Sequence, residues 1–492
     1  MIAPGRAGRP RRRESEQVAG RRLAIVVLVV AVVVVVALVD RTAPPPAPAA
    51  APVLSAMTIP SAGAPTSSWY CAGGTTGTGS QANTTIYVTN TGNRTVAGAV
   101  STTVFTGKAP ASTHQTISVP PNGAVAVNPG IDAPVGYGAT TVTLAGGGIG
   151  VTQVAAGPDG WSTAPCASVT SNSWYFAAGA TTAGNQLVLA LYNPTSTDAV
   201  ADVSFDTNDG VITPQLYQGL VVPAGQLVVE NVGDYVQNRS TIATVVAAQS
   251  GQIVADQLQL TSSAKSGLSL SLGAPAVRPH WYFAQTTNSS GAGSSVSLLL
   301  SNPGRTPETA VISVGLVQGE VAPVTVDIPA ASVVPFAASG ENRIPHQVPY
   351  SVDVSSTGGP GLVVARAVLG PNGASLPAFG TMLGTPQIGN DWLVPAPGAG
   401  TAPGVQGAAV ASLSVSNPGP AMARVTVGPL GGTPAQAKLL LIKPHSLLVL
   451  AEAPVGGLIT LDVRSDVPVA VEEDSVPSGA AGVVSSTGLP AG

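Results

Sequence analysis

The stretch SNSWYFAAGATTAGNQLVLALYNPTSTDAVADVSF, from Ser171 to Phe205, decides the fold of this chain. It opens on a group of aromatic residues and continues with an alternating apolar segment. An Asn-Pro turn at Asn193 then separates that segment from a second one. Alternation with a period of two is typical of half-buried strands, and Asn-Pro favours a turn between them. The stretch therefore predicts the start of an antiparallel β module.

The same start occurs four times along the chain. Its tryptophans are separated by 105, 107 and 111 residues, and they are Trp69, Trp174, Trp281 and Trp392. Each is followed by an alternating apolar run that ends at an asparagine, namely Asn90, Asn193, Asn302 and Asn417. A third landmark follows about 30 residues later, around Pro121, Pro223, Pro329 and Pro444. Ordered landmarks at matching offsets indicate an internal repeat.

The length and composition of each repeat indicate its fold class. About 105 residues with frequent turn signals are typical of an immunoglobulin-like β-sandwich, whereas propeller blades usually repeat every 40–50 residues. The chain has 58 Gly, 44 Pro and only 9% charged residues, a composition that disfavours long soluble helices. We therefore predict an all-β exterior of four tandem immunoglobulin-like β-sandwich repeats after an N-terminal transmembrane helix. The predicted repeats are residues 66–168, 169–276, 277–387 and 388–480, with a flexible tail at 481–492, and their arrangement as a rod or a compact ring is left open.

The N-terminus predicts the compartment. Residues 1–22 carry seven Arg and two Glu, and residues 23–39 are an unbroken apolar run. Seventeen helical residues span about 26 Å, close to the hydrocarbon thickness of a bilayer. We predict a transmembrane helix at 23–39, a cytoplasmic basic tail at 1–22, and a Pro- and Ala-rich linker at 40–65 that leads to extracytoplasmic repeats. A cleaved signal peptide is the rival interpretation.

Charge and motifs limit the possible functions. From Arg41 onward the chain has 13 basic and 21 acidic residues, a net charge of −8, which disfavours nucleic-acid binding. The four histidines form no metal-binding motif, and no nucleophile elbow or phosphate-binding loop occurs, so no enzyme, cofactor or metal is predicted. Residues 206–210 (DTNDG) are interpreted as a hairpin turn rather than a calcium loop. The acidic cluster at 472–475 (EEDS) is interpreted as a solvated strand end.

Both cysteines lie in the first repeat, Cys71 near its start and Cys166 at the junction that leads to the second repeat. In an exported chain such a pair predicts one disulfide, which would close a loop of about 95 residues and add a few kcal/mol of stability. Phe176 and Phe283 stand at the position equivalent to Cys71 in the next two repeats. We interpret them as apolar residues that fill the same place.

The repeated aromatic residues have two interpretations. As core residues, the tryptophans anchor one sheet against the other. As an exposed platform, they would stack on sugar rings, and the candidate glycan-stacking residues are Trp69, Trp174, Tyr175, Trp281 and Tyr282. The fourth repeat keeps Trp392 but has Leu393 and Val394 where the others have aromatic residues or Cys71. That substitution favours the core interpretation.

The serial WYC and WYF motifs with their NTG and NPG turns, the basic tail, the single apolar run and the Pro-Ala spacer resemble the actinobacterial exported proteins grouped as the DUF5719 family. The resemblance covers nearly the whole chain. Members of that family tend to be encoded near envelope glycosyltransferases, so the resemblance implies a membrane-anchored exported protein of unknown function with a role in the cell envelope. It supplies no functional residue.

Two functions follow as expectations. The first is a non-enzymatic, membrane-anchored extracytoplasmic protein that acts as a structural or scaffolding component of the cell envelope and contacts other envelope proteins. The alternative is an envelope polysaccharide-binding accessory protein of a glycosyltransferase system, with cell-wall polysaccharide as its partner. Solvent exposure of Tyr175, Tyr282 and their tryptophan neighbours would discriminate between them. The oligomeric state is left open.

Overall fold

Antiparallel strands make up nearly all of the regular structure. The computed structural model describes residues 57–77, 79–107, 110–262, 266–288, 294–370, 379–396, 409–452, 459–477 and 484–491. In these ranges there are 34 strands and four 3-10 turns but no α-helix, so the all-β prediction is confirmed. None of these ranges contains a helix long and apolar enough to cross a membrane. The predicted transmembrane helix at 23–39, like the basic tail and most of the linker, lies outside the described residues.

The first group of strands, module 1, forms two packed four-stranded sheets. The outer sheet has the order β5-β4-β7-β1, from β5 (Ala111–Val119), β4 (Val96–Phe105), β7 (Gly136–Leu144) and β1 (Ser67–Cys71). The inner sheet has the order β6-β3-β8-β9, from β6 (Gly123–Val127), β3 (Asn83–Asn90), β8 (Ile149–Gly157) and β9 (Gly160–Pro165). The short strand β2 (Thr75–Thr76) pairs with β7 and β3 and joins the two sheets.

Modules 2 and 3 repeat this arrangement. The outer sheet of module 2 contains β10 (Ser173–Phe176), β16 (Ile242–Ser250), β12 (Ala199–Thr207), β13 (Gly210–Ile212) and β14 (Leu220–Val222), and its inner sheet contains β15 (Leu227–Asn231), β11 (Asn185–Tyr192), β17 (Val254–Thr261) and β18 (Gly267–Leu272). The outer sheet of module 3 contains β19 (His280–Thr287), β24 (Pro349–Thr357), β21 (Glu308–Leu316) and β22 (Glu320–Ile328), and its inner sheet contains β23 (Ser332–Ala337), β20 (Ser295–Asn302), β25 (Val363–Leu369) and β26 (Phe379–Leu383).

Module 4 has the same pairing with one modification. Its strands are β27 (Gly389–Ala396), β28 (Ala409–Asn417), β29 (Ala423–Pro429), β30 (Lys438–Ile442), β31 (Ser446–Glu452), β32 (Ile459–Pro477), β33 (Val484–Thr487) and β34 (Leu489–Pro490). The long strand β32 pairs with β27 and β29 through its first half, and with β28 and β33 through its second half. It therefore belongs to both sheets of the module.

The strand order differs from that of an immunoglobulin constant domain. In such a domain the first two strands share a sheet. Here the first long strand, β1, pairs with β7 in the outer sheet, whereas the second, β3, pairs with β8 in the inner sheet. The immunoglobulin-like part of the fold prediction is therefore not confirmed by the strand pairing.

Each module encloses its opening tryptophan. All four indole rings are at most 2% exposed and belong to the hydrophobic clusters between the two sheets. The Nε1–H group of Trp174 donates to the Ile253 carbonyl at 2.9 Å, and that of Trp281 donates to the Leu362 carbonyl at 2.8 Å. The core interpretation of the tryptophans is confirmed.

The repeated asparagine fastens two distant turns together. Asn302 is fully buried, and its Nδ2 group donates to the carbonyls of Thr306, Ile328 and Pro329 at 2.9, 3.3 and 3.1 Å. Its Oδ1 atom accepts from the Gly304 amide at 2.9 Å. Corresponding bonds are made by Asn90, Asn193 and Asn417. In each module the repeated asparagine therefore binds the strand end at the third sequence landmark.

We predict that Asn302→Ala lowers the free energy of unfolding by about 3 kcal/mol, because it removes several buried hydrogen bonds and leaves two carbonyls of a strand end without a donor. Urea denaturation of residues 55–492 measures the change. Asn208→Ala is the matched control, since Asn208 is exposed in the β12–β13 turn. An effect of Asn302→Ala no larger than that of the control would contradict the fastening role.

The disulfide of module 1 is replaced by Phe-Gly pairs in modules 2 and 3. Cys71 and Cys166 are bonded, as predicted, with their Cα atoms 4.7 Å apart. The residue equivalent to Cys166 is Gly273 in module 2 and Gly384 in module 3, because each donates its amide to the matching inner strand. A Cβ atom on Gly384 would lie 2.9 Å from Cζ of Phe283. The phenyl ring therefore fills the space of the second cysteine and requires glycine opposite it.

We predict that Gly384→Ala destabilises the protein by about 1–3 kcal/mol, because the added methyl group overpacks the core of module 3 against Phe283. Phe283→Leu together with Gly384→Ala restores part of that loss, since leucine leaves room for the methyl group. Thermal and urea unfolding of the two variants measure the coupling. Additive effects of the two substitutions would argue against direct contact.

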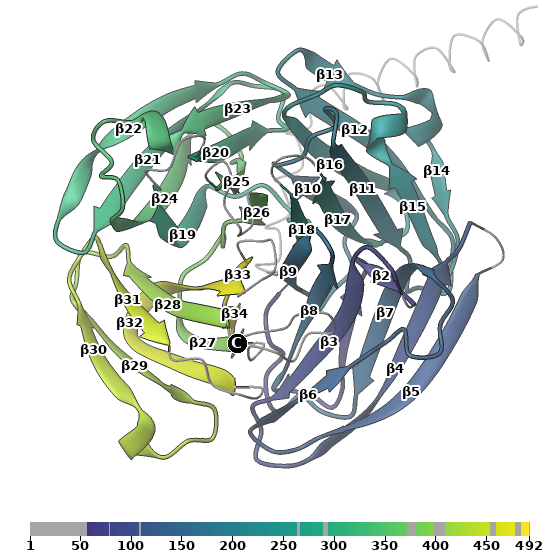
Figure 1. The fold of residues 1–492 in the computed structure, drawn as a ribbon, viewed down its shortest axis with the longest axis horizontal. Coiled ribbons are helices and arrows are strands. Elements are labelled where there is room, and N and C mark those ends of the chain that lie inside the picture. The colour runs from purple at the N-terminus through teal and green to yellow at the C-terminus, as the bar shows by residue number, and fades with distance from the viewer. Residues whose placement is uncertain are drawn as a thin grey trace, which may run out of the picture. The chain divides into compact units, whose positions relative to one another are not determined.

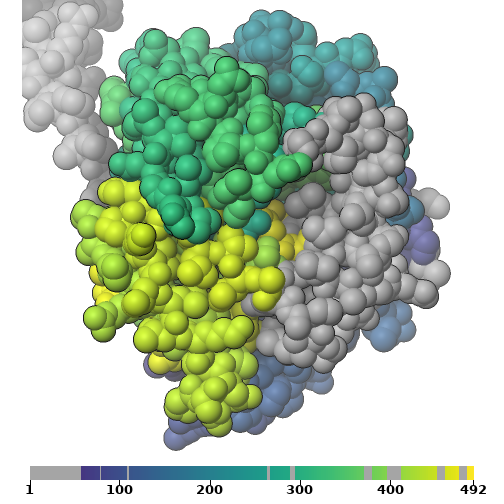
Figure 2. Space-filling model, turned by 60° about the vertical axis from the view of Figure 1, so that its left-hand side comes forward, coloured from purple at the N-terminus to yellow at the C-terminus, as the bar shows by residue number. Residues whose placement is uncertain are grey.

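Four inner strands hold the modules together around a common centre. Strand β9 packs against β18, β18 against β26, β26 against β33, and β33 against β9 (Figure 1). Modules 1 and 2 also share an apolar cluster that includes Ala155, Leu258 and Leu270. Figure 2 shows module 3 (green) lying directly on module 4 (yellow). The modules of the described unit therefore form a closed ring rather than a rod.

The ring closes where the two ends of this unit meet. The Ile59 amide donates to the Pro490 carbonyl at 3.0 Å, and Ile59 clusters with Leu393 and Leu489. A Cβ atom on Gly150 of β8 would lie 2.9 Å from the Leu489 side chain, so β34 lies directly against module 1. The prediction of a flexible tail at 481–492 is wrong for residues 484–491. They form β33 and β34 because β32 and β27 offer them pairing edges.

Candidate functional site at the module junctions

The junctions between modules bring together the polar and charged residues that the sequence scatters. Among the described residues, no cluster of His, Cys, Asp and Glu side chains could hold a metal ion. Residues 206–210 are the turn of the β12–β13 hairpin, with the Thr207 hydroxyl donating to the Gly210 carbonyl at 2.8 Å, so the hairpin interpretation is confirmed. The candidate sites are the central cavity, two buried polar contacts and two outer grooves.

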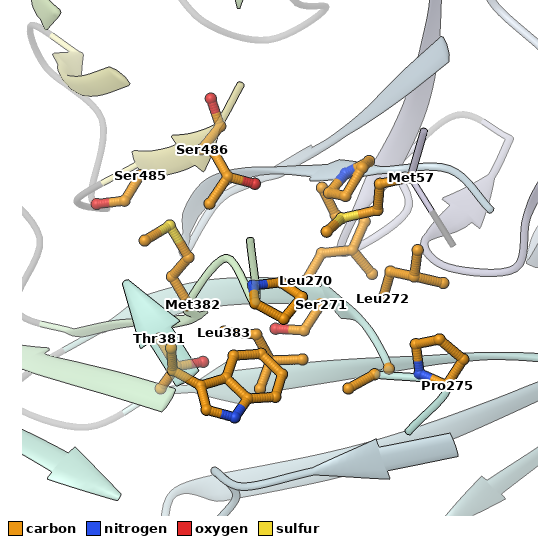
Figure 3. Close-up of a pocket in the computed structure, with 18 of the residues that line it drawn as sticks. Met57, Leu270, Ser271, Leu272, Pro275, Thr381, Met382, Leu383, Ser485 and Ser486 are labelled. Carbon is orange, nitrogen blue, oxygen red and sulfur yellow. The ribbon is translucent and has the colours of Figure 1, made fainter. Parts of the chain in front are cut away.

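The central cavity lies where the inner strands of all four modules meet. Its volume is ≈ 60 Å³, and its walls are mainly apolar. Figure 3 shows Met57, Leu270, Met382 and Ser485 arranged around it. Sites for drug-sized ligands usually have volumes of about 300–1,000 Å³. The cavity is too small to enclose a sugar ring, and we assign it to imperfect packing at the centre of the ring.

A buried carboxylate joins modules 1 and 2. Asp256 on β17 is fully buried and accepts hydrogen bonds from the Ala72 amide at 2.9 Å and from Nε2 of Gln153 at 2.6 Å. Both donors belong to module 1, so the carboxylate of module 2 reaches across the junction. Burial raises the pKa of Asp256 to about 7, against the opposing effect of these hydrogen bonds.

A buried ion pair occupies the equivalent position between modules 3 and 4. Nη2 of Arg366 lies 2.6 Å from Oε1 of Glu472, and both side chains are at most 3% exposed. The same nitrogen donates to the Ser485 hydroxyl at 2.7 Å and lies 3.4 Å from Asp474. Arg366 on β25 occupies the position that Gln153 has on β8. Glu472 on β32 occupies the position that Asp256 has on β17. The two junctions therefore use the same strand positions for a buried polar contact, which is an amide with a carboxylate at one junction and an ion pair at the other.

The ionic contact corrects one expectation from the sequence. Glu472 was expected at a solvated strand end but is 1% exposed, because β32 carries it into the junction with module 3. Burial raises the pKa of Glu472, whereas the positive charge of Arg366 acts to lower it. Removing either partner would leave the other charge buried and uncompensated, which is strongly destabilising.

We predict that the ring loses stability as the pH rises from about 4 to 7. A carboxyl whose folded pKa is raised contributes most below its unfolded pKa, and this contribution is lost as the pH passes through the folded value. For Asp256, raised from 3.8 to about 7, the loss is about 4 kcal/mol at most. Asp256→Asn keeps an acceptor for both donors and removes this loss.

Urea denaturation at pH 5 and pH 8 measures the difference in unfolding free energy for each protein. We expect the decline between these pH values to be smaller in Asp256→Asn than in the unaltered chain. Asp132→Asn is the control, because Asp132 is exposed in a loop of module 1. Equal declines in both variants would rule out Asp256 as a source of the pH dependence.

An outer groove between modules 3 and 4 contains Tyr282. It has a volume of ≈ 180 Å³, and its walls include Tyr282, Asp353, Glu320 and His445. The half-buried ring of Tyr282 stacks on His280 with centroids 6.0 Å apart, and Oδ1 of Asp353 lies 3.6 Å from Nδ1 of His280. Burial raises the pKa of Tyr282 to about 12 and also raises that of Asp353. The groove combines an aromatic ring with carboxylates.

A larger outer groove lies at the equivalent place between modules 4 and 1. Its volume is ≈ 820 Å³, and its walls include Leu439, Asp462 and Arg464 from module 4 and Asn122 from module 1. Leu393 pairs with Asp462 as Tyr282 pairs with Asp353, which shows that the two grooves occupy matching positions. At the corresponding place between modules 1 and 2, the hydroxyl groups of Tyr192 and Thr141 form a hydrogen bond of 2.8 Å.

The structure separates the candidate glycan-stacking residues. Trp69, Trp174 and Trp281 are buried in the module cores, so their rings offer no exposed face and the stacking interpretation is wrong for them. Tyr175 is half-buried and packs against the core of module 3. Tyr282 lines an outer groove.

The sequence analysis missed the residues that join the modules. Asp256 and Arg366 are the single charged residues of the strand segments VADQLQL and VVARAVL, whose other residues are apolar or glutamine. In a chain with only 9% charged residues, an isolated charge in such a run is a signal that could have identified a junction.

Comparison with known proteins identifies one segment. Residues 132–268 match the model of DUF5719, described as a family of unknown function. The match confirms the predicted resemblance to this family for residues 132–268. The matching segment begins before β7 of module 1 and ends in β18 of module 2, so it includes Cys166 and Asp256. No protein with curated annotation matches the sequence. The DUF5719 description assigns no activity to the junction residues.

Proposed function

We propose that this DUF5719 chain is a non-enzymatic scaffolding protein of the cell envelope, attached to the membrane through residues 23–39 with its four modules on the extracytoplasmic side. The observation that carries the proposal is the closed ring of modules. Packed inner strands and the buried Arg366–Glu472 pair hold the modules in fixed positions. A rigid ring with outward-facing strand edges suits a platform for other proteins.

Features of the sequence support the location. The basic tail and apolar run precede the modules, and the Cys71–Cys166 disulfide fits an oxidising compartment. We also propose that each module is a variant of the immunoglobulin-like sandwich, since two packed sheets around a buried tryptophan are features of that class.

We predict that the full-length chain, extracted from membranes of its source in mild detergent, sediments together with other envelope proteins as a complex larger than one chain. Glycan-degrading enzymes leave that complex intact, because its contacts are between proteins. Analytical ultracentrifugation and chemical cross-linking measure it. Sedimentation as a single chain would contradict the scaffolding role.

A second candidate function is binding of an envelope polysaccharide, and the groove of Tyr282 and Asp353 favours it. Aromatic rings beside carboxylates can stack on and hydrogen-bond to sugars. Titration calorimetry of residues 55–492 with fractionated envelope polysaccharide tests this function. It requires saturable binding that Tyr282→Ala weakens at least tenfold, whereas the exposed control Tyr235→Ala leaves it unchanged.

A further inference from the structure

The outermost strand of module 4 differs from its counterparts in the other modules. Strands β5, β22 and β30, with the short β14, each end at a buried residue whose carbonyl accepts from the repeated asparagine; these residues are Val119, Ile328, Ile442 and Val222. This contact aligns the four strand ends residue by residue. The two outward-facing positions before the buried residue are Thr116 and Ser118 in module 1, and Thr325 and Asp327 in module 3.

In module 4 the same two positions are leucines. Leu439 is 67% exposed and Leu441 is 57% exposed, the largest apolar exposures on the outer strands. Module 2 has Gly219 and the exposed Val221 at these positions. The comparison between repeats shows that folding does not require leucine there, because the aligned positions in modules 1 and 3 are polar.

Positive charge surrounds the two leucines. Lys438 and Lys443 stand at the two ends of the strand, and Arg424 pairs directly with Leu441 across the β29–β30 ladder. All three side chains are exposed, and none forms a salt bridge with a carboxylate among the described residues. The exterior as a whole is acidic, so this concentration of cations is local.

One edge of β30 is unpaired. Among the described residues the strand pairs only with β29, and it lies at the outer rim of the ring (Figure 1). Edge strands present a row of free N–H and C=O groups that can pair with another strand. Leu439 also lines the ≈ 820 Å³ groove between modules 4 and 1, so the edge adjoins a space for side chains.

From these observations we propose that β30 is a docking edge for an extended acidic segment of another exported protein, which adds to the outer sheet as an antiparallel strand. The partner strand carries apolar residues at alternate positions, where they pack on Leu439 and Leu441, and carboxylates at both ends, where they meet Lys438 and Lys443. This inference rests on the proposed scaffolding function and specifies the kind of partner.

Two other occupants fit the edge less well. A lipid bilayer would leave the free N–H and C=O groups of β30 without partners in hydrocarbon. A second copy of this chain, paired about Leu440, would place Leu439 opposite Leu441 but would also place Lys438 of each copy beside Lys443 of the other. Like charges at such close range oppose pairing, whereas an acidic partner satisfies both the backbone and the charges.

The probe is a synthetic peptide, Asp-Asp-Val-Thr-Val-Thr-Val-Asp-Asp with blocked termini, and the protein is the full chain in detergent. We expect saturable binding by fluorescence anisotropy, and slower amide hydrogen exchange in β30 when the peptide is bound. Leu439→Thr with Leu441→Asp installs the residues of module 3 and is expected to lower the affinity at least tenfold. Val221→Ser in module 2 is the matched control and leaves the affinity unchanged.

A charge exchange provides a second variant. The double variant Lys438→Glu with Lys443→Glu is expected not to bind the acidic peptide. It is expected to bind a second peptide in which lysines replace the four aspartates. Absence of peptide binding, or binding that none of these substitutions changes, overturns the proposal.

Two further results would assign the edge to another occupant and also overturn the proposal. The first is a concentration-dependent dimer that the double leucine variant abolishes. The second is sedimentation of residues 55–492 with phosphatidylglycerol vesicles that the same variant abolishes. If the peptide fails to bind but the native complex with envelope proteins persists, the scaffolding function stands and its contacts lie elsewhere.

Discussion

Burial of the inner sheets on both faces is the constraint on which the rest of this structure depends. Every residue of β17 and all but the last residue of β8 are buried, whereas the residues of the outer strand β5 before its buried last residue alternate between exposed and half-buried. One face of each inner sheet packs against its own outer sheet, and the other packs against neighbouring modules. A single module would expose that second face to water. In other repeat proteins, too, stacking against neighbouring units stabilises each unit.

The second face of the inner sheets is not purely apolar, and this sets how the junctions behave. Asp256 and Glu472 occupy matching strand positions and reach donors on the preceding module. Such contacts specify which faces pair, because a carboxylate without its donors would be costly to bury. They also connect the assembly of the ring to pH through the raised pKa of Asp256.

The outer surfaces of the modules are less constrained than the inner ones and have diverged further. The groove position holds Tyr282 and Asp353 at one junction, Leu393 and Asp462 at the next, and a hydroxyl contact at a third. The outer edge is polar in modules 1 and 3 but apolar and flanked by cations in module 4. The buried tryptophan and asparagine recur in all four modules, whereas the outer grooves and edges differ, which is the pattern expected of a fixed framework with different binding surfaces.

By itself the sequence determined the all-β class, the four repeated tryptophans and asparagines, and the Cys71–Cys166 disulfide, because these depend on local alternation, turn chemistry and the pairing of two cysteines. The tertiary structure alone decided the closed ring, the ordering of residues 484–491 and the pairing of Arg366 with Glu472. In VADQLQL the alternating Gln257 and Gln259 suggest a water-exposed face, but both side chains are buried and donate to the Ala178 and Gln186 carbonyls of the same module. The interpretation of Glu472 as solvated failed for the same reason. Alternation shows that a strand has one polar face, and only the packing of distant segments decides whether water or protein covers it.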